Sequence, residues 1–225
     1  MISVLVLVSA LDEESGIRLT LSEIKQYLPE SKLIVIDGNS VDKTVNVAKN
    51  YGADILFQKG KGKGDAIACG IESIKCNIDY IVFTDADYTY PAKYIPNMIK
   101  ILNDNPNVGM VCGNRFNSQL DVASMKYFYF GNKLIAHMHN ALNGVSLNDP
   151  LTGLRAMRWD VLKEWKPISN GFDIEVELNR YIEKKGYDIK EVEITYRERV
   201  GKKKLRARHA LPIVKRIISE FIIKS

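Results

Sequence analysis

The sequence predicts an α/β fold, a single domain built on a mostly parallel sheet with helices on both faces. Short apolar runs alternate with longer stretches of helical periodicity through the first half of the chain, which is typical of parallel strands joined by helices. These runs are continuously apolar, as in strands that are buried on both faces. A length of 225 residues with 46% hydrophobic residues suffices for one large core.

The first half of the chain alternates strands and helices in a regular order. Strands are expected over Ile2–Val8, Leu33–Ile36, Asp54–Gln58, Tyr80–Thr84 and Val108–Cys112. Helices are expected over Gly16–Tyr27, Lys43–Tyr51, Asp65–Lys75 and Ala92–Asn103. In the first of these helices, apolar residues recur at helical spacing and define one buried side, as an amphipathic helix requires.

The second half is less regular. Helices are expected over Met125–Leu142 and Asp173–Lys185, and a half-exposed strand over Asp188–Tyr196. From Ala210 onward, one apolar helical face is defined by Ile213, Val214, Ile217, Ile218, Phe221 and Ile222. No internal repeat or low-complexity linker divides the chain. We therefore expect one domain over residues 1–209, followed by an amphipathic C-terminal helix over residues 210–225.

Composition limits the class of protein. No stretch approaches the roughly 18 apolar residues of a membrane-spanning helix. The run Ile2–Val8 has no basic region before it and is interpreted as a buried strand rather than a signal peptide. Cys69, Cys76 and Cys112 lack metal-ligand spacing, so they are interpreted as reduced thiols of a cytoplasmic protein.

Basic residues are concentrated near the C-terminus. The net charge is only +5, but one cluster comprises Arg197, Arg199, Lys202, Lys203, Lys204, Arg206 and Arg208. Such a run is a solvated face, or it binds an anionic substrate or an acidic membrane surface. Nucleic acid is not expected as a partner, because aromatic residues do not interleave with the charges and no reading helix is recognisable.

Polar side chains follow the predicted strands at the points where the strands end. Asp12, Asp37, Asp85, Asp87 and Arg115 all occupy such positions. Ligands of open α/β sheets bind beyond the carboxyl ends of the strands. Two carboxylates one residue apart suit Mg²⁺, which combines one or two carboxylates with phosphate oxygens and water. A solvated turn after the strand is the alternative for Asp85 and Asp87.

Two loops add further binding groups. In Asp37–Thr44, Gly38 permits a sharp turn and Asp37 is placed to accept hydrogen bonds from a base or ribose. The segment Gly60–Asp65 alternates glycine with lysine at the start of a helix, which favours an anion such as a diphosphate. It matches neither the P-loop nor the dinucleotide-binding fingerprint.

In this order the motifs resemble those of the inverting glycosyltransferases of family 2 with a GT-A fold, specifically the polyprenyl (dolichyl) phosphate sugar synthases. The resemblance spans roughly residues 1–206. It rests on the segments SALDEE (Ser9–Glu14), DGNSVDKT (Asp37–Thr44), GKGDAI (Gly62–Ile67), TDADYTYP (Thr84–Pro91), GNR (Gly113–Arg115), NDPLTGLRAMR (Asn148–Arg158), GFDIEVEL (Gly171–Leu178) and EITYRERVGKKKLR (Glu193–Arg206).

The resemblance implies a role for individual residues. It implies a Rossmann-like nucleotide-sugar site made by Ala10, Leu11, Glu13, Asp37, Lys63, Asp85, Ala86 and Asp87. Asp85 and Asp87 are the implied ligands of Mg²⁺ or Mn²⁺. The implied acceptor-phosphate residues are Arg115, Arg197, Arg199 and Lys204, and the implied catalytic set is Asp87, Arg115, Asp149 and Arg199. The segment with Asp149, Thr152 and Arg155 shapes the sugar and acceptor side.

The chain departs from the family pattern at several positions. Leu11 replaces a common aromatic residue, and Gly38 replaces a frequent second aspartate. Lys203 stands where serine is common, and Thr89 where glutamine is often found. These changes bear on the identity of the base and sugar rather than on the reaction class, and they favour a UDP-sugar over GDP-mannose.

The chemistry of the acceptor distinguishes two reactions. A phosphate monoester has a second pKa of about 6, so a lipid phosphate is largely dianionic at neutral pH and needs cations rather than a strong base. A sugar hydroxyl needs a carboxylate that takes its proton, for which Asp149, Asp173 and Glu175 are candidates. We expect inversion at the anomeric carbon, which gives a polyprenyl phosphate sugar and a nucleoside diphosphate.

A lipid acceptor implies contact with a membrane. The segment Ala210–Ser225 and the helix Met125–Leu142 are candidates to lie in the interface, with core packing as the alternative. We expect peripheral attachment to the cytoplasmic leaflet. His137 and His139, two residues apart, point to different helix faces and are interpreted as ordinary polar positions rather than metal ligands.

Two other functions remain compatible with the sequence. One is a family 2 glycosyltransferase that acts on a sugar hydroxyl. The other is a non-catalytic nucleotide-sugar-binding membrane adaptor, against which the intact Asp85 and Asp87 argue. A nucleotidyltransferase is not favoured, because its early glycine-rich loop is missing.

Overall fold

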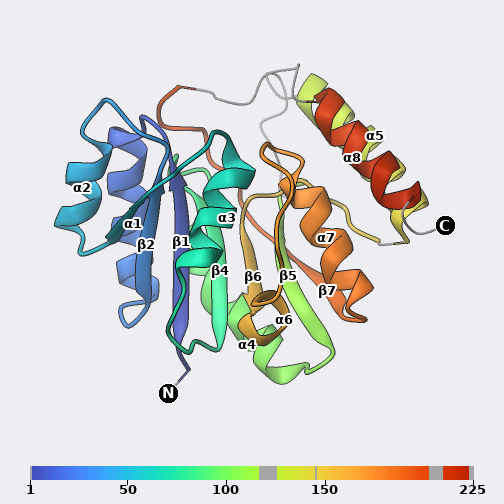
Figure 1. Ribbon diagram of the computed structural model, residues 1–225, viewed down its shortest axis with the longest axis horizontal. Coiled ribbons are helices and arrows are strands. Elements are labelled where there is room, and N and C mark those ends of the chain that lie inside the picture. The colour runs from blue at the N-terminus through green and yellow to red at the C-terminus, as the bar shows by residue number, and fades with distance from the viewer. Residues whose placement is uncertain (1, 117–125, 145, 203–209, 223–225) are drawn as a thin grey trace.

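A seven-stranded sheet organises the molecule (Figure 1). The computed structural model describes residues 2–116, 126–144, 146–202 and 210–222. The strand order is β3-β2-β1-β4-β6-β5-β7, and every pairing is parallel except those of β6 with β4 and with β5. The predicted α/β class with a mostly parallel sheet is confirmed.

The strands confirm six predicted strands, including the one expected over Asp188–Tyr196, with shifted ends. Their bounds are β1 Val4–Ala10, β2 Lys32–Asp37, β3 Asp54–Phe57, β4 Tyr80–Asp85, β5 Val108–Asn114, β6 Arg155–Arg158 and β7 Asp188–Glu193. β1 begins and ends two residues later than predicted, so Ser9 and Ala10 belong to the strand and pair with Asp85 and Asp37. The polar residues at the ends of β1, β2 and β4 therefore share one edge of the sheet.

The helices follow the predicted order, with shifted ends. Their bounds are α1 Glu14–Tyr27, α2 Thr44–Asn50, α3 Lys63–Ser73, the 3₁₀ turn η1 Ala92–Tyr94, α4 Ile95–Asp104, α5 Lys126–Asn143, α6 Trp159–Leu162, α7 Ile174–Lys184 and α8 Ala210–Ile222. The third helix starts at Lys63 rather than Asp65. The predicted first residue of α5, Met125, lies outside the described residues.

The strand β6 and the short helix α6 were not predicted. β6 has the sequence Arg-Ala-Met-Arg and is nevertheless buried at its first three positions. The guanidinium of Arg155 is only 1% exposed and donates to the carbonyl groups of Pro150 and Thr152 and to Asn179 Oδ1. Because these partners come from other segments, a buried arginine cannot be recognised from local periodicity.

Helices cover both faces of the sheet. One core joins α1, α2 and α4 to one face, with Ile17, Leu21 and Met98 fully buried. The other core joins α3, α6 and α7 to the opposite face, with Ile67 and Leu178 among its members. The chain turns to opposite sides of β1 to form β2 and β4. The switch point, where ligands of such sheets bind, therefore lies between the carboxyl ends of β1 and β4.

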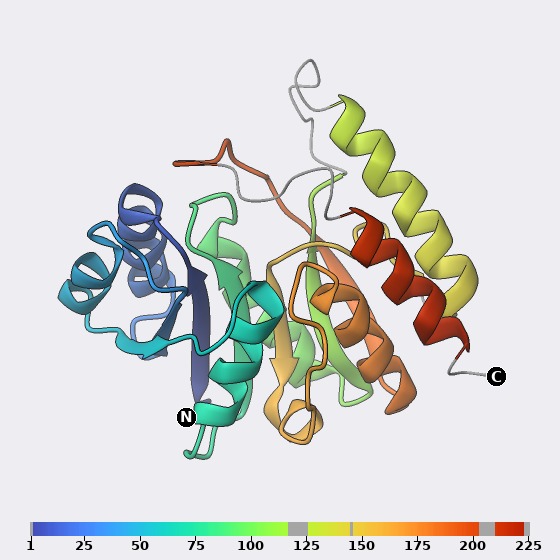
Figure 2. The same cartoon turned by 45° about the horizontal axis from the view of Figure 1, so that its top comes forward.

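The helices α5 and α8 lie side by side next to α7, as Figures 1 and 2 show. A small core joins Ile213 and Ile217 of α8 to Val176 of α7 and Ile135 of α5. Arg216 of α8 pairs with Asp173 at 3.3 Å. The C-terminal helix is thus packed through one of its faces. Across the described ranges, no helix has both the length and the apolar character to cross a membrane.

His139 is fully buried in α5, unlike His137, which is exposed. The interpretation of both as ordinary polar positions is therefore wrong for His139. Its Nε2 lies 3.3 Å from Asn179 Nδ2, within the network that holds Arg155. Burial lowers the pKa of His139 to about 4, because the charged imidazolium would lose its hydration in the core.

His139 should make the protein sensitive to acid. Its pKa is lowered on folding from 6.5 to about 4, so the unfolded chain takes up this proton first. The stabilisation is complete above pH 6.5 and is lost as the pH falls toward 4, by about 3 kcal/mol. Urea unfolding of His139→Gln should show a correspondingly flatter pH dependence. His137→Gln is the matched control, and an equal change in both variants would contradict the assignment.

Candidate active site

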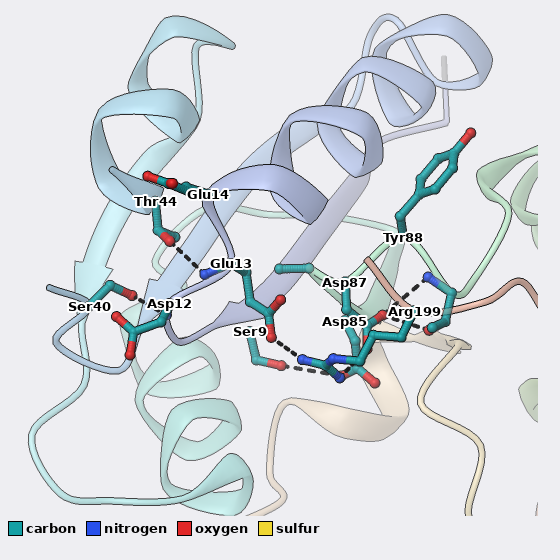
Figure 3. Close-up of polar contacts among 12 residues, drawn as sticks. Ser9, Asp12, Glu13, Glu14, Ser40, Thr44, Asp85, Asp87, Tyr88 and Arg199 are labelled. Atoms are coloured by element: carbon teal, nitrogen blue, oxygen red, sulfur yellow. Dashed lines mark hydrogen bonds and ion pairs between the residues drawn. The ribbon is translucent and has the colours of Figure 1, made fainter. Parts of the chain in front are cut away.

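Two carboxylates stand at the carboxyl end of β4 (Figure 3). Asp85 is the last residue of the strand, and Ser9 Oγ lies 3.4 Å from its Oδ1. Asp87 is 4% exposed, and its Oδ1 accepts hydrogen bonds from Thr89 N at 3.1 Å and Thr89 Oγ1 at 2.6 Å. Between them the chain turns through Ala86, and Tyr88 adopts a positive φ of 66°. The turn thus fixes both carboxylates at the switch point.

Arg199 bridges Asp87 to Glu13, which follows β1 (Figure 3). One guanidinium nitrogen lies 2.5 Å from Asp87 Oδ2, and the other pairs with Glu13. Burial raises the pKa of Asp87, and the charge of Asp85 adds to this effect, whereas Thr89 and Arg199 oppose it. The arginine therefore offsets part of the negative charge gathered here.

The segment that carries Arg199 crosses the end of β4. Arg197 N donates to the Thr89 carbonyl and Val200 N to the Asp87 carbonyl, each at 3.1 Å. The Arg197 guanidinium makes two bonds to Glu23, at 2.7 and 2.8 Å, and lies over the ring of Tyr88. Arg197, a predicted phosphate residue, is thus held against α1. Lys204, another, lies outside the described residues.

Lys63 joins two carboxylates on the other side of Asp85. Its ammonium lies 2.8 Å from Asp85 Oδ1 and 2.9 Å from Oε1 of Glu175, on the first turn of α7. Burial alone would lower the pKa of Lys63, but the two carboxylates raise it above its ordinary value. Lys63 is therefore charged and lies beside the predicted metal ligand.

The glycines around Lys63 serve close packing. A Cβ on Gly62 would lie 2.2 Å from the Asn170 carbonyl oxygen, and one on Gly64 would lie 2.0 Å from that of Ser169. The N–H groups of Gly64 and Asp65 both reach the Asn170 carbonyl, at 3.0 and 3.4 Å. These two amides, which the sequence assigns to an anion, are thus used inside the protein.

Arg115 and Asp149 form a second buried pair. The Nε and Nη2 of Arg115 lie 2.5 and 2.7 Å from the two Asp149 oxygens. Asp149 is fully buried, and Arg115 also lies over the ring of Tyr196. Burial would lower the pKa of Arg115, but Asp149 raises it above the ordinary value. Asp149 therefore acts in this structure as the carboxylate that orients Arg115.

The predicted base end of the site lies after β1 and β2. Asp37 is fully buried, and its oxygens accept hydrogen bonds from Ser40 N at 2.8 Å and Ser40 Oγ at 2.6 Å. Ser40 Oγ also accepts from Asp12 N at 2.8 Å, which ties the two loops together. Leu11 is 42% exposed, whereas Ala10 is buried and accepts from Gly38 N. Asp37 thus shapes the turn, and Leu11 presents an apolar surface.

Sequence reasoning missed two residues that line the acidic centre. A Cβ on Gly153 would lie 2.6 Å from Asp85 Oδ2 and 3.0 Å from Lys63 Nζ. The Gly153 N–H donates to the Tyr90 hydroxyl at 2.7 Å. Gly153 stands inside the quoted motif NDPLTGLRAMR, but its closeness to Asp85 depends on the unpredicted strand β6. Likewise Glu175 was proposed only as a possible base and not as the partner of Lys63.

The acidic centre suits a divalent cation that arrives with phosphate oxygens. Glu13, Asp85, Asp87 and Glu175 face Lys63 and Arg199, so four carboxylates exceed two cations by two charges. Within the described ranges, no group of three or more acidic, cysteine or histidine ligands could hold a metal alone. Mg²⁺ typically completes its shell with phosphate and water when two carboxylates are available. The residues therefore fit a metal that is shared with a diphosphate.

Similarity to known proteins agrees with these features of the site. Residues 5–165 match the glycosyl transferase family 2 profile, so the chain belongs to this family and is a glycosyltransferase. Two relatives from Haloferax volcanii illustrate the similarity. A dolichyl-phosphate hexose transferase of Haloferax volcanii is 30% identical over 89% of this chain and 85% of its own length. The low-salt glycan biosynthesis hexosyltransferase Agl6 of the same organism is 28% identical over 89% of this chain and 49% of its own length.

Solved structures show that the fold is GT-A-like. Glucosyl-3-phosphoglycerate synthase from Mycobacterium tuberculosis, in complex with Mn²⁺, UDP-glucose and phosphoglyceric acid, superposes with a TM-score of 0.76 at 20% identity. The match covers 97% of this chain and 79% of that one. The same enzyme in complex with Mg²⁺ and UDP gives a TM-score of 0.72 at 21% identity, over 98% of this chain and 78% of that one.

Helix α1 approaches the aspartate motif so closely that only glycine fits at position 16. A Cβ there would lie 2.7 Å from the Ala86 carbonyl oxygen and 2.9 Å from the Asp87 Cα. Gly16→Ala should lower the free energy of unfolding by about 1–3 kcal/mol and weaken binding of Mn²⁺ with UDP. The matched control is Gly131→Ala, in an exposed part of α5 where a Cβ meets nothing within 4 Å. That change should stabilise by up to about 1 kcal/mol.

Urea unfolding and titration with Mn²⁺ and UDP measure both effects. If Gly16→Ala were as stable as the parent and bound UDP equally well, α1 would not determine the position of Asp87.

Proposed function

We propose that this glycosyltransferase moves a hexose or N-acetylhexosamine from a nucleotide sugar to a polyprenyl or dolichyl phosphate. The observation that carries the proposal is the acidic centre at the β1–β4 switch point, with cations on both sides. An excess of two negative charges among these six side chains suits a divalent ion, and the ion suits a nucleotide diphosphate. The name of the Haloferax volcanii hexose transferase supports the lipid acceptor.

The donor diphosphate would lie at Asp85 and Asp87. When bound there, Mg²⁺ or Mn²⁺ would stabilise the charge of the departing nucleoside diphosphate. Lys63 and Arg199 are the cations close enough to these carboxylates to meet its oxygens. The base would lie toward Leu11, where an exposed leucine replaces a common aromatic residue, and we favour a UDP-sugar. The similar Mycobacterium tuberculosis enzyme in complex with UDP-glucose or UDP supports this choice.

The state of the candidate bases favours a phosphate acceptor over a hydroxyl. Asp149 is bound to Arg115, Asp173 to Arg216 and Glu175 to Lys63. Part of the hydrogen-bonding capacity that each carboxylate could offer an acceptor hydroxyl is therefore already used by a cation. A dianionic phosphate needs no such base. It needs a cation, and Arg115 can meet a phosphate through its planar guanidinium.

The reaction would proceed with inversion. The phosphate oxygen would attack the anomeric carbon as the bond to the nucleoside diphosphate breaks, so an α-linked donor would give a β-linked product. The buried, preoriented Arg115 would need little reorganisation as the acceptor charge changes. A product with only the α linkage would contradict inversion without contradicting the transfer itself.

A transfer assay tests the donor and the acceptor together. Purified protein with Mn²⁺, a short polyprenyl phosphate and a panel of UDP- and GDP-sugars should give a lipid-phosphate sugar, identified by mass in the organic phase. Asp87→Ala should lower the rate by at least about 100-fold, since it removes a carboxylate that holds the diphosphate metal. Asp104→Asn, on the exposed end of α4, should leave the rate unchanged.

Two other results would redirect the assignment. Transfer to a soluble sugar but not to lipid phosphates would establish a hydroxyl acceptor. Tight nucleotide binding without turnover on any acceptor would support the non-catalytic adaptor.

The lipid acceptor brings a second part of the proposal, peripheral membrane contact through α8. Leu211, Ile218 and Ile222 are 61%, 42% and 63% exposed, whereas Ile213 and Ile217 are buried against α7 and α5. Leu134 of the neighbouring α5 is 63% exposed. Exposed apolar side chains on an amphipathic helix suit the interface of a bilayer. We propose that the outward face of α8 lies on the cytoplasmic leaflet.

Substitution of the exposed residues tests this contact better than deletion of the helix, because deletion would also expose the packed face. The variant with Leu211, Ile218 and Ile222 changed to Ser should bind vesicles of anionic phospholipid at least about tenfold more weakly in a sedimentation assay. Ile2→Ser, at an exposed apolar residue near the N-terminus (Figure 1), is the control. Equal vesicle binding by the triple variant and the parent would contradict the role of α8.

A further inference from the structure

Lys63 is shared between two carboxylates that come from different parts of the sheet edge. Asp85 ends β4, and Glu175 belongs to the first turn of α7. The ammonium lies 2.8 Å from Asp85 Oδ1 and 2.9 Å from Glu175 Oε1. Its side chain is 12% exposed, so bulk water contributes little to balancing its charge. Removing either carboxylate must therefore be compensated by the other.

Glu175 has spare capacity for this lysine. The residue is 5% exposed, and its Oε2 is buried without a hydrogen-bond partner in the described part of the chain. Buried carboxylate oxygens normally accept hydrogen bonds, because their loss of hydration is otherwise uncompensated. An ammonium carries three donors. If it left Asp85, the Lys63 ammonium could therefore bond to both oxygens of Glu175.

The helices that carry the pair are fixed relative to each other. The side chain of Glu177, two residues after Glu175 in α7, accepts the N–H groups of Ile168 and Ser169 at 3.0 and 2.7 Å. The next residue, Asn170, accepts the Gly64 N–H of α3 through its carbonyl oxygen. The start of α7 is thus connected to the start of α3 through the Glu177 carboxylate, the segment Ile168–Asn170 and a backbone bond to Gly64. The contact between Glu175 and Lys63 does not depend on Asp85.

We propose that Glu175 is a positioning residue of the donor site, which holds the Lys63 ammonium when Asp85 binds the divalent cation. This inference rests on the proposed function. An ammonium bound only to Asp85 would compete with the metal for the same oxygens. With Glu175 present, Lys63 gives up Asp85 but remains charged, buried and next to it. The ammonium then lies beside the oxygens of the donor diphosphate.

The test is Mn²⁺ binding in the presence of UDP, measured by calorimetry or by the electron paramagnetic resonance of free Mn²⁺. Glu175→Gln keeps the shape of the side chain but removes the charge that retains Lys63. We expect it to weaken Mn²⁺ binding by about 10- to 100-fold, the range found when a residue that supports a metal ligand is changed. Glu183→Gln removes the same charge from the other end of α7 and should leave Mn²⁺ binding unchanged.

A double-mutant cycle separates positioning from simple charge. In a Lys63→Gln background there is no ammonium to retain, so adding Glu175→Gln should change Mn²⁺ affinity by less than about twofold. If Glu175→Gln weakens binding equally in both backgrounds, Glu175 acts by its charge or as a ligand, and the inference is wrong. Unchanged affinity of the single variant would also overturn it.

A charge-conserving variant and melting temperatures distinguish loss of Mn²⁺ binding from loss of folding. Glu175→Asp keeps the charge and should recover most of the affinity even if Glu175→Gln proves less stable, with melting temperatures measured for each variant. Failure to recover affinity in a folded Glu175→Asp would contradict retention of Lys63 by charge. If the parent binds no Mn²⁺ with UDP, the metal-dependent donor site itself is wrong. If the parent binds both but transfers to no lipid phosphate, only the acceptor assignment fails.

Discussion

The structure depends on one electrostatic constraint, the gathering of Glu13, Asp85, Asp87 and Glu175 around two cations at the end of β4. Like charges gathered in a partly buried site repel one another unless cations separate them. Lys63 separates Asp85 from Glu175, and Arg199 separates Asp87 from Glu13. Burial raises the pKa of Asp87, and the charge of Asp85 adds to this effect. Such a site is prepared for a further positive charge, and it binds that charge most favourably with an anionic ligand.

The two arginines of the site differ in how firmly they are held. Arg115 is bound bidentately by a fully buried Asp149, and Glu191 of β7 accepts the Asp149 N–H at 2.8 Å. The orientation of Arg115 is therefore fixed through Asp149 by strand β7 of the sheet. Arg199 belongs to an irregular segment that is attached to the aspartate motif by two backbone bonds. A fixed cation suits an acceptor phosphate that must be aligned, whereas a cation on a loop can follow a diphosphate that enters and leaves.

The sequence predicts the parts of this arrangement that are local. Continuous apolar runs predict β1 to β5, and an alternating pattern predicts β7, so that six of the seven strands of the described sheet are identified. The polar residues after the apolar runs predict the edge where the candidate site lies. The pairings between distant segments cannot be predicted in this way. Glu13 and Arg199 are 186 residues apart. The strand β6 begins with Arg155, which is buried only because Pro150 and Thr152 in the loop before it and Asn179 of α7 accept its hydrogen bonds. Asp149 and Asp37 were predicted as site residues, and their buried bonds to Arg115 and Ser40 indicate that they orient neighbouring groups.

The same distinction explains why an aspartate pair alone does not specify a function. Asp85 and Asp87 would form an ordinary solvated turn if no other segment packed closely against them. Here Gly16 and Gly153 bring α1 and the loop before β6 within van der Waals distance of the motif, so the carboxylates lose water and their charge must be balanced by protein or ligand. Close packing thus turns the common Asp-x-Asp pattern into a pair of partly buried carboxylates that need a compensating positive charge. The glycines that permit this packing are therefore as necessary to the proposed metal and diphosphate site as the carboxylates that would bind the ligand.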